Sequence, residues 1–199
     1  MNLPSSTRVV IIGGGIIGCS IAYHLAQRGV RDVVVLERLQ LTHGATWHAA
    51  GLVGQLRSSS NLTLLRRYGA ELYGEREAQT GQATGWHRTG SLRIASSPAR
   101  WQELKRSATM AKGFDFRVDL VSPREAREKF PLLELGGVVG AAWIEGDGDV
   151  DPASLTMAYA AGARTGGVAI HQGVRVTGLK KRGRRVTAVI TDQGEIEAE

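Results

Sequence analysis

Hydrophobic positions near the start of the chain follow the periods of a strand–helix–strand unit. Residues 8–12 form a short β-branched run, which is typical of a buried strand. Between residues 16 and 28 apolar side chains recur at helical spacing, and Gly29 follows as a C-terminal cap signal. A second buried strand is predicted over residues 33–36, ending at Glu37. Because a βαβ unit of about 30 residues requires a parallel sheet, the chain is predicted to be an α/β protein.

Further along the chain, helical and strand patterns follow one another. Residues 39–54 lack a strong period and are expected to form an ordered loop running into a short helix. Helices are predicted over residues 61–80, 98–112, 123–130 and 151–164, and strands over residues 91–95, 138–144, 168–171, 174–179, 186–191 and 195–199. The last strand pattern reaches the end of the sequence without a cap or a turn, which favours a fragment of a longer protein.

The segment from Gly13 to Gly18 reads G-G-G-I-I-G and matches G-x-G-x-x-G. In this motif Gly13 permits the tight turn from strand to helix. Gly15 lets a pyrophosphate approach the backbone, and Gly18 lets the helix pack closely on the strand. The N–H groups and dipole at the helix start would then face the phosphate charge. The strand before the motif and the helix and strand after it favour a dinucleotide site over a turn that binds nothing.

An acidic residue stands where the ribose of a dinucleotide is expected. Glu37 lies 19 positions after the last motif glycine, close to the spacing of about 20 for a ribose-binding acid. Its charge disfavours the 2′-phosphate of NADP, which leaves NAD or FAD. Ala22, Leu25 and Gly29, followed by Glu37 and Arg38, extend the motif in the manner of amino-acid-oxidase-like flavoproteins. This extension favours FAD.

The segment from Gly44 to Leu52 reads G-A-T-W-H-A-A-G-L. Its small residues let the backbone lie against a flat ring, Thr46 offers a hydroxyl, and His48 offers an imidazole, a nucleophile near pH 7 when neutral. The segment resembles the flavin-attachment loop of the dimethylglycine and sarcosine dehydrogenases. In that family the histidine of W-H-x-A-G carries FAD covalently through the 8α carbon of the flavin. The resemblance implies this role for His48. Taken alone, a histidine beside a tryptophan is more often a packing residue.

The resemblance extends over nearly all of the chain. Residues 51–57 are similar to the sarcosine branch, and residues 146–148, 151–152 and 154–156 to the dimethylglycine branch; residues 77–81, 85–86, 90–92 and 130–132 resemble other segments of the family. The resemblance implies that Val176 presents backbone groups to adenine. The positions expected to contact FAD are Gly13, Gly14, Gly15, Ile16, Ile17, Gly18, Glu37, Arg38, Gly44, Ala45, Thr46, Trp47, His48, Ala49, Ala50, Gly51, Leu52 and Val176. No catalytic residue is identified.

The fold implied by the resemblance is a Rossmann-like FAD-binding domain of the two-dinucleotide-fold flavoprotein type, with the start of a mixed-sheet substrate domain. The FAD-binding βαβ unit and attachment loop are expected over residues 1–60. The start of the substrate domain, with a helical insertion, is expected over residues 61–150. Residues 151–199 return to the FAD-binding domain, which is expected to be truncated.

The resemblance also implies an activity, the oxidative N-demethylation of sarcosine or dimethylglycine. The iminium product would hydrolyse, or its one-carbon unit would pass to tetrahydrofolate in a C-terminal region outside these residues. Electrons would go to an electron-transfer flavoprotein or to oxygen. The alternatives are another amine-oxidising flavoenzyme with noncovalent FAD, a non-catalytic regulatory paralogue, and an inactive fragment that binds FAD.

Composition adds few constraints to this interpretation. The net charge is +6, and the basic cluster at residues 180–185 is interpreted as a solvated hairpin turn rather than a nucleic-acid patch. Cys19 is the only cysteine and is interpreted as a small packing residue, and a cytoplasmic location is expected. No membrane span and no signal pattern are found. Asp147, Asp149 and Asp151 alternate as in a calcium loop, but turn chemistry and helix capping are favoured, and no metal site is expected.

Overall fold

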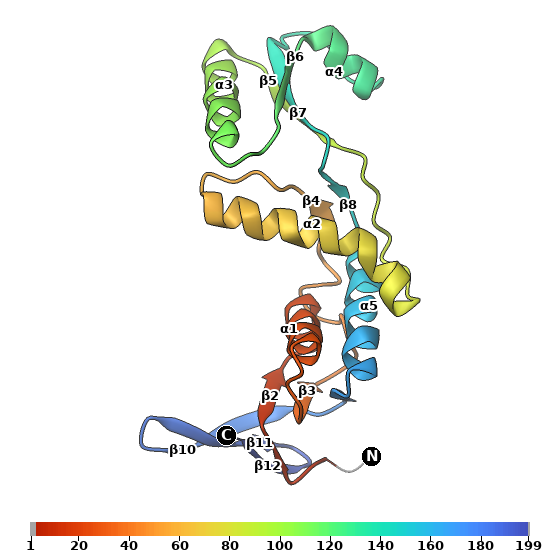
Figure 1. The fold of residues 1–199 in the computed structure, drawn as a ribbon, viewed down its shortest axis with the longest axis vertical. Coiled ribbons are helices and arrows are strands. Elements are labelled where there is room, and N and C mark those ends of the chain that lie inside the picture. The colour runs from red at the N-terminus through yellow and green to blue at the C-terminus, as the bar shows by residue number, and fades with distance from the viewer. Residues whose placement is uncertain (1–2, 199) are drawn as a thin grey trace. The chain divides into compact units, whose positions relative to one another are not determined.

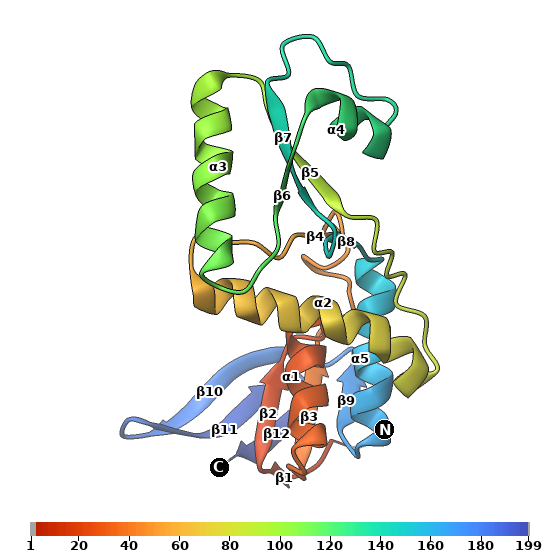
Figure 2. The same cartoon turned by 45° about the horizontal axis from the view of Figure 1, so that its top comes forward.

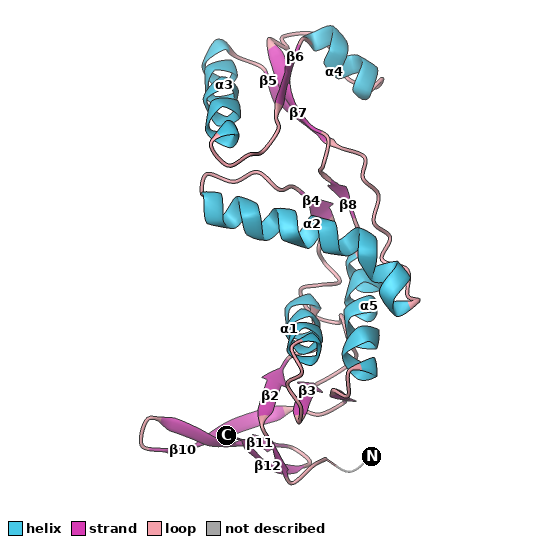
Figure 3. Cartoon of the chain, in the orientation of Figure 1, coloured by secondary structure: helices cyan, strands magenta, loops and turns pink. Residues whose placement is uncertain are grey.

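The computed structural model describes residues 3–198 of the 199-residue chain. These residues form two compact units. The first unit runs to Gly51, includes Tyr73–Gly85, and resumes from Val150. The second unit consists of Leu52–Leu72 and Trp86–Asp149. Figures 1 and 3 show the elements of each unit along the chain.

A parallel sheet is the centre of the first unit. Its strands β2 (Val9–Ile12), β3 (Val33–Glu37) and β9 (Ala169–Gln172) lie in the order β2-β3-β9. Helix α1 (Ile16–Gln27) connects β2 to β3, and α5 (Pro152–Thr165) precedes β9. The two helices lie side by side (Figure 2), with the rings of Tyr23 and Tyr159 5.5 Å apart between their centroids. The predicted βαβ unit and α/β class are confirmed.

A second sheet packs on the other face of β3. Its strands lie in the order β1-β12-β11-β10, and their bounds are β1 (Ser6–Thr7), β12 (Gly194–Ala198), β11 (Arg185–Thr191) and β10 (Val176–Arg182). Alternate residues of β3 face opposite layers: Val33 and Val35 belong to the core beneath the helices, whereas Val34 and Leu36 join Ile196 in the core beneath the second sheet. Burial on both faces explains the continuous apolar run of this strand.

The second unit is built on an antiparallel sheet. Its strands β5 (Ser91–Ala95), β7 (Gly140–Ile144) and β6 (Asp119–Val121) lie in the order β5-β7-β6. Helices α3 (Pro98–Lys112) and α4 (Pro123–Lys129) flank it, and β4 (Leu52–Val53) pairs with β8 (Gly148–Asp149). Helix α2 (Ser60–Thr80) begins in this unit and ends in the first.

Most predicted elements are present, with bounds that differ by a few residues. The short helix expected at the end of residues 39–54 is wrong: residues 41–48 form successive turns, and Leu52–Val53 is the strand β4. The two- and three-residue strands β1, β6 and β8 were not predicted, since pairings this short leave no periodic signal. The basic cluster lies at the exposed β10–β11 hairpin, as predicted. Among residues 3–198, no helix is long and apolar enough to cross a membrane.

Candidate functional site

The glycine turn between β2 and α1 has the geometry that its sequence predicts. Gly13 has φ +106°, a conformation that favours glycine, and its N–H donates to the Leu36 carbonyl at 2.8 Å. A Cβ at Gly18 would overlap the carbonyl oxygen of Gly13, so only glycine lets α1 approach the strand this closely. The first backbone N–H groups of α1 therefore point out of a tight turn at the carboxyl end of β2.

Glu37, at the end of β3, stabilises this turn by hydrogen bonds. One carboxylate oxygen accepts from the Gly14 N–H at 2.7 Å, and the other accepts from the Leu39 N–H at 2.9 Å. Gly14 is buried against the same strand, and a Cβ there would overlap the Leu41 side chain. A carboxylate has about four lone-pair sites, so Glu37 keeps acceptor capacity for a sugar hydroxyl. The sequence indicated the sugar role of Glu37 but not its contact with Gly14.

The turns after β3 are tied to the glycine turn. Leu41 N–H donates to the side-chain oxygen of Gln172 at 2.7 Å, and Thr42 N–H donates to the Gly14 carbonyl at 3.1 Å. The hydroxyl of Thr46 accepts from the Ile16 N–H at 3.0 Å, at the start of α1. These bonds place the 43–50 segment, which contains His48, beside the helix N-terminus.

A groove of about 510 Å³ lies at this junction. It is lined by Ile11, Ile12, Gly13, Gly15, Ile16, Ile17, Gly18, Ile21, Glu37, Arg38, Leu39, His43, Gly44, Ala45, Thr46 and Ala49. A second hollow of about 330 Å³ shares four of these residues and reaches Val176, through Ile12, Gly13, Leu36, Glu37, Arg38, Val174 and Arg175. All of these residues belong to the first unit.

The groove brings together eleven of the eighteen predicted residues, and Val176 lines the adjoining hollow. Gly14 is buried beneath the turn, and Trp47, His48 and Ala50 are exposed next to the groove. The remaining two are Gly51, at the end of the first unit's opening segment, and Leu52, in β4 of the second unit.

The sequence did not point to Ile12, Ile21, Leu39, His43, Val174 or Arg175, which also line these hollows. Only Ile21 carried a usable signal, since it lies one helical turn after Ile17 on the same face of α1.

The groove fits the chemistry of a dinucleotide. Backbone N–H groups at the start of α1 suit a pyrophosphate, and Glu37 suits ribose hydroxyls. A Cβ at Gly13 would meet no protein atom within 4 Å, so the surface of the turn is open to a ligand. Ile17 is 74% exposed, and Ile12, Ile21 and Leu39 are exposed beside it, which gives the groove an apolar wall for a flat ring.

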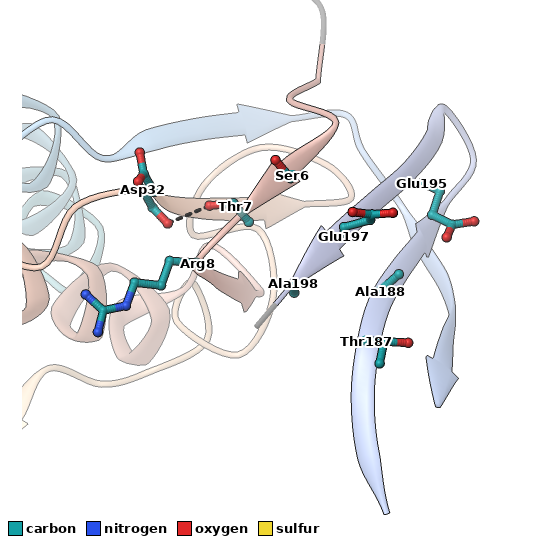
Figure 4. Close-up of a pocket in the computed structure, with 9 residues that line it drawn as sticks. All are labelled: Ser6, Thr7, Arg8, Asp32, Thr187, Ala188, Glu195, Glu197 and Ala198. Carbon is teal, nitrogen blue, oxygen red and sulfur yellow. Dashed lines mark hydrogen bonds between the residues drawn. The ribbon is translucent and has the colours of Figure 1, made fainter. Parts of the chain in front are cut away.

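A larger hollow, of about 720 Å³, lies near the start of β1 (Figure 4). It is lined by Ser6, Thr7, Arg8, Asp32, Thr187, Ala188, Glu195, Glu197 and Ala198. Thr7 donates its hydroxyl proton to the Asp32 carbonyl at 2.5 Å there. No predicted site residue lines this hollow and no helix begins in it, so the candidate site is the groove at the glycine turn.

The three alternating aspartates have separate structural roles. The Asp147 carboxylate is buried and accepts from the Gln55 N–H and the Ser91 hydroxyl. Asp149 lies 3.2 Å from His87, and Asp151 caps α5. The predicted helix capping is confirmed for Asp151, whereas the predicted turn chemistry does not describe Asp147 and Asp149, whose side chains bind residues far away in the sequence. Among the described residues, no three His, Cys, Asp or Glu side chains gather in a way that could hold a metal ion.

A parallel βαβ unit with a glycine turn that is open on its outer surface, a helix N-terminus beside it and an acid at the end of the second strand defines a Rossmann-like dinucleotide-binding protein. The family model described as FAD dependent oxidoreductase matches residues 8–199. The chain therefore belongs to the FAD-dependent oxidoreductase family.

Several curated relatives are similar to the chain over nearly its whole length. Dimethylglycine dehydrogenase of Homo sapiens is 43% identical over 95% of the chain, and sarcosine dehydrogenase of Mus musculus is 38% identical over 98%. The pyruvate dehydrogenase phosphatase regulatory subunit of Mus musculus is 36% identical over 99%. The chain spans 22% of the length of each of these relatives.

Solved structures share the fold. The crystal structure of L-proline dehydrogenase from P. horikoshii superposes with a TM-score of 0.93 at 28% identity, covering 98% of this chain and 52% of that one. The predicted fold class, a Rossmann-like FAD-binding domain of this flavoprotein type, is confirmed.

Proposed function

We propose that the groove of the first unit binds FAD. The start of α1 would hold the pyrophosphate, Glu37 the ribose, and backbone groups at Val176 the adenine. One observation carries this proposal: the helix N-terminus, Glu37 and the segment around Thr46 converge on a single groove. The residues proposed to contact FAD are Gly13, Gly14, Gly15, Ile16, Ile17, Gly18, Glu37, Arg38, Gly44, Ala45, Thr46, Trp47, His48, Ala49, Ala50, Gly51, Leu52 and Val176.

His48 is the proposed attachment point for the cofactor. Bound FAD supplies an oxidising flavin ring whose 8α carbon can bond to an imidazole nitrogen. Formation of that bond would release one proton from the imidazole and one from the 8α carbon, and the two electrons would pass to oxygen or another acceptor. The W-H-A-A-G sequence supports this role, as does the position of His48: its side chain is exposed, and the next residue, Ala49, lines the groove.

The proposed reaction is the oxidative N-demethylation of an N-methyl amino acid, sarcosine or dimethylglycine. A hydride equivalent leaves the N-methyl carbon for the cofactor. Water then adds to the iminium carbon, giving formaldehyde and the demethylated amine, or the one-carbon unit passes to tetrahydrofolate. The similarity to enzymes named for dimethylglycine and sarcosine supports this substrate class.

The remaining assignments concern the protein beyond the groove. We propose an electron-transfer flavoprotein or oxygen as electron acceptor, and we place the tetrahydrofolate site in a region outside these residues. The 1–60, 61–150 and 151–199 division into domains stays a prediction. A cytoplasmic location also stays a prediction, and the dimethylglycine and sarcosine dehydrogenases that the chain resembles carry mitochondrial names.

The second candidate is a regulatory role without turnover, in a chain that still binds FAD. It is favoured by the similarity to the phosphatase regulatory subunit over 99% of the chain. The flavin-linking sequence around His48 favours the enzyme, since a subunit without redox chemistry has little use for a covalent flavin.

Anaerobic reduction of the bound flavin distinguishes the two candidates. The FAD-loaded protein is mixed with sarcosine, dimethylglycine or glycine, and the visible absorbance of the flavin is followed. We expect bleaching by an N-methyl amino acid and none by glycine, which lacks the methyl group. Bound flavin that no N-methyl amino acid reduces would favour the regulatory role.

A further inference from the structure

Thr46 is the single buried residue between positions 43 and 50. Its exposed fraction is 7%, whereas the seven residues around it are all exposed, and Trp47 reaches 70%. A segment with one buried side chain depends on that side chain for its attachment to the fold. Thr46 is polar, so its burial requires a hydrogen-bond partner.

That partner is the N-terminus of α1. The Thr46 hydroxyl accepts from the Ile16 N–H at 3.0 Å, and Gly15, the N-cap residue of the helix, has no side chain to cap it. Thr46 therefore caps α1 from 30 positions along the chain, and it satisfies an N–H that the helix leaves unpaired. A Cβ at Gly15 would lie 3.0 Å from the Thr46 hydroxyl, so a residue without a side chain is needed for this close approach.

Backbone hydrogen bonds on both sides of Thr46 connect its anchored side chain to His48. His48 N–H donates to the Ala45 carbonyl and Ala49 N–H donates to the Thr46 carbonyl, each at 3.2 Å. These overlapping turns span Thr46 and fix the path of the chain on both sides of it. Fixing the Thr46 side chain at the helix start therefore fixes where the His48 backbone lies relative to α1.

We propose that Thr46 is a positioning residue for flavin attachment. It holds the segment carrying His48 at the N-terminus of α1, so that the imidazole and the pyrophosphate site keep a fixed separation before the cofactor arrives. This inference rests on the proposed covalent function. It assigns to Thr46 a role separate from contact with the cofactor: acting through the position of His48.

The test compares Thr46→Val, which removes the hydroxyl, with Thr46→Ser, which keeps it. Apoprotein is mixed with saturating FAD, and acid-precipitable flavin is followed with time. We expect Thr46→Val to attach flavin about tenfold more slowly, the effect of one lost hydrogen bond on positioning, and Thr46→Ser to stay within about threefold of the wild type. Noncovalent FAD affinity is measured separately in the His48→Ala background, and each attachment rate is determined at an FAD concentration that saturates the variant.

Amide hydrogen exchange of the apoprotein tests the positioning without any flavin chemistry. In Thr46→Val the Trp47, His48 and Ala49 amides should exchange about tenfold faster, while those of β2 are unchanged. Thr7→Val is the matched control, because Thr7 is 8% exposed and loses one hydrogen bond at the opposite end of β2. This variant should change neither the rate of flavin attachment nor the exchange rates of the Trp47, His48 and Ala49 amides.

Two results would overturn the inference: attachment at the wild-type rate in Thr46→Val, or unchanged exchange of the three amides. If the wild-type protein forms no covalent flavin at all, the proposed link at His48 has failed. The exchange measurement then decides the positioning role alone, with faster exchange supporting it and unchanged exchange rejecting it.

Discussion

At the residue scale, Glu37 shows how one side chain can serve both the fold and the cofactor. Its carboxylate accepts from two backbone N–H groups that hold the glycine turn, and it lines the groove that the turn creates. Hydrogen bonds to a charged acceptor are each worth about 1.5–3 kcal/mol. Loss of the carboxylate therefore affects both stability and binding, and the two effects can be measured apart.

Glu37→Ala should weaken FAD binding by about 1–3 kcal/mol, because the ribose hydroxyls lose a charged acceptor. It should also lower the free energy of unfolding of the apoprotein by about 2 kcal/mol, since the Gly14 and Leu39 N–H groups lose their partner. FAD titration and urea unfolding measure the two effects. Glu77→Ala, which removes an exposed carboxylate from α2, is the control and should change neither. Unchanged FAD affinity in Glu37→Ala would remove Glu37 from the ribose role.

Cys19 is the other residue whose environment makes a quantitative prediction. It is 0% exposed, its thiol donates weakly to the Gly14 carbonyl, and burial raises the pKa of the thiol from 9.0 to about 11. Below about pH 9 the thiol is protonated in both the folded and the unfolded state, so its ionisation does not change the free energy of unfolding. As pH rises from about 9 to 11 the unfolded state releases the proton first, and stability falls.

Cys19→Ala removes this pH dependence. The stability advantage of the wild type over the variant should shrink by about 2 kcal/mol between about pH 8 and pH 11, measured by urea unfolding at each pH. Other groups titrate in this range in both proteins, so the difference between them isolates Cys19. If the difference in unfolding free energy between the wild type and Cys19→Ala stays constant over this range, the raised pKa of a buried Cys19 thiol is contradicted.

At the scale of elements, caps and periodicity made the helices predictable. Helix α3 was predicted over 98–112 and has these bounds, because Ser97 and Pro98 start it and Gly113 ends it. The turns at residues 41–48 were not predicted, because their bonds to Gly14, Ile16 and Gln172 come from other elements. The sequence of residues 41–48 alone does not indicate these partners, which lie far away along the chain.

Helix α5 gives a prediction at this scale. Asp151 caps it by accepting from the Ser154 N–H at 2.6 Å, and hydrogen bonds with the side chain and the backbone N–H of Ser154 lower the pKa of Asp151. Asp151→Ala should cost about 1 kcal/mol of stability. Because the folded pKa is the lower one, the charged cap contributes fully above the ordinary aspartate pKa, and its contribution is lost as pH falls through the folded value.

Asp151→Asn keeps a neutral cap and separates the two effects. Relative to this variant, the wild type should lose stability as pH is lowered from about 6 to 3, as followed by thermal unfolding. A difference between the two proteins that does not change with pH would contradict a stabilising charge at this position.

At the scale of the whole molecule, the part of the site that residue patterns could predict is the part contiguous in sequence, whereas Val176 was expected only from the family resemblance. The Gly13–Gly18 turn, Glu37 and the segment around Thr46 each carry a local motif. Arg175, which follows a different strand, reaches the site only because β9 pairs with β3. The family resemblance led us to expect that residues 151–199 return to the domain of residues 1–60, but it did not indicate that Tyr73–Gly85 belongs to the first unit, because no local motif marks that segment.

The central claim is a covalent bond between FAD and His48, and the denatured intact mass tests it most directly. Protein produced with FAD is unfolded, freed of bound cofactor and weighed, and a digest locates any added mass. We predict an increase of one FAD on the peptide containing His48, lost in His48→Ala while that variant still binds FAD reversibly. An unmodified mass with flavin released on unfolding, or an adduct on another residue, would contradict the claim.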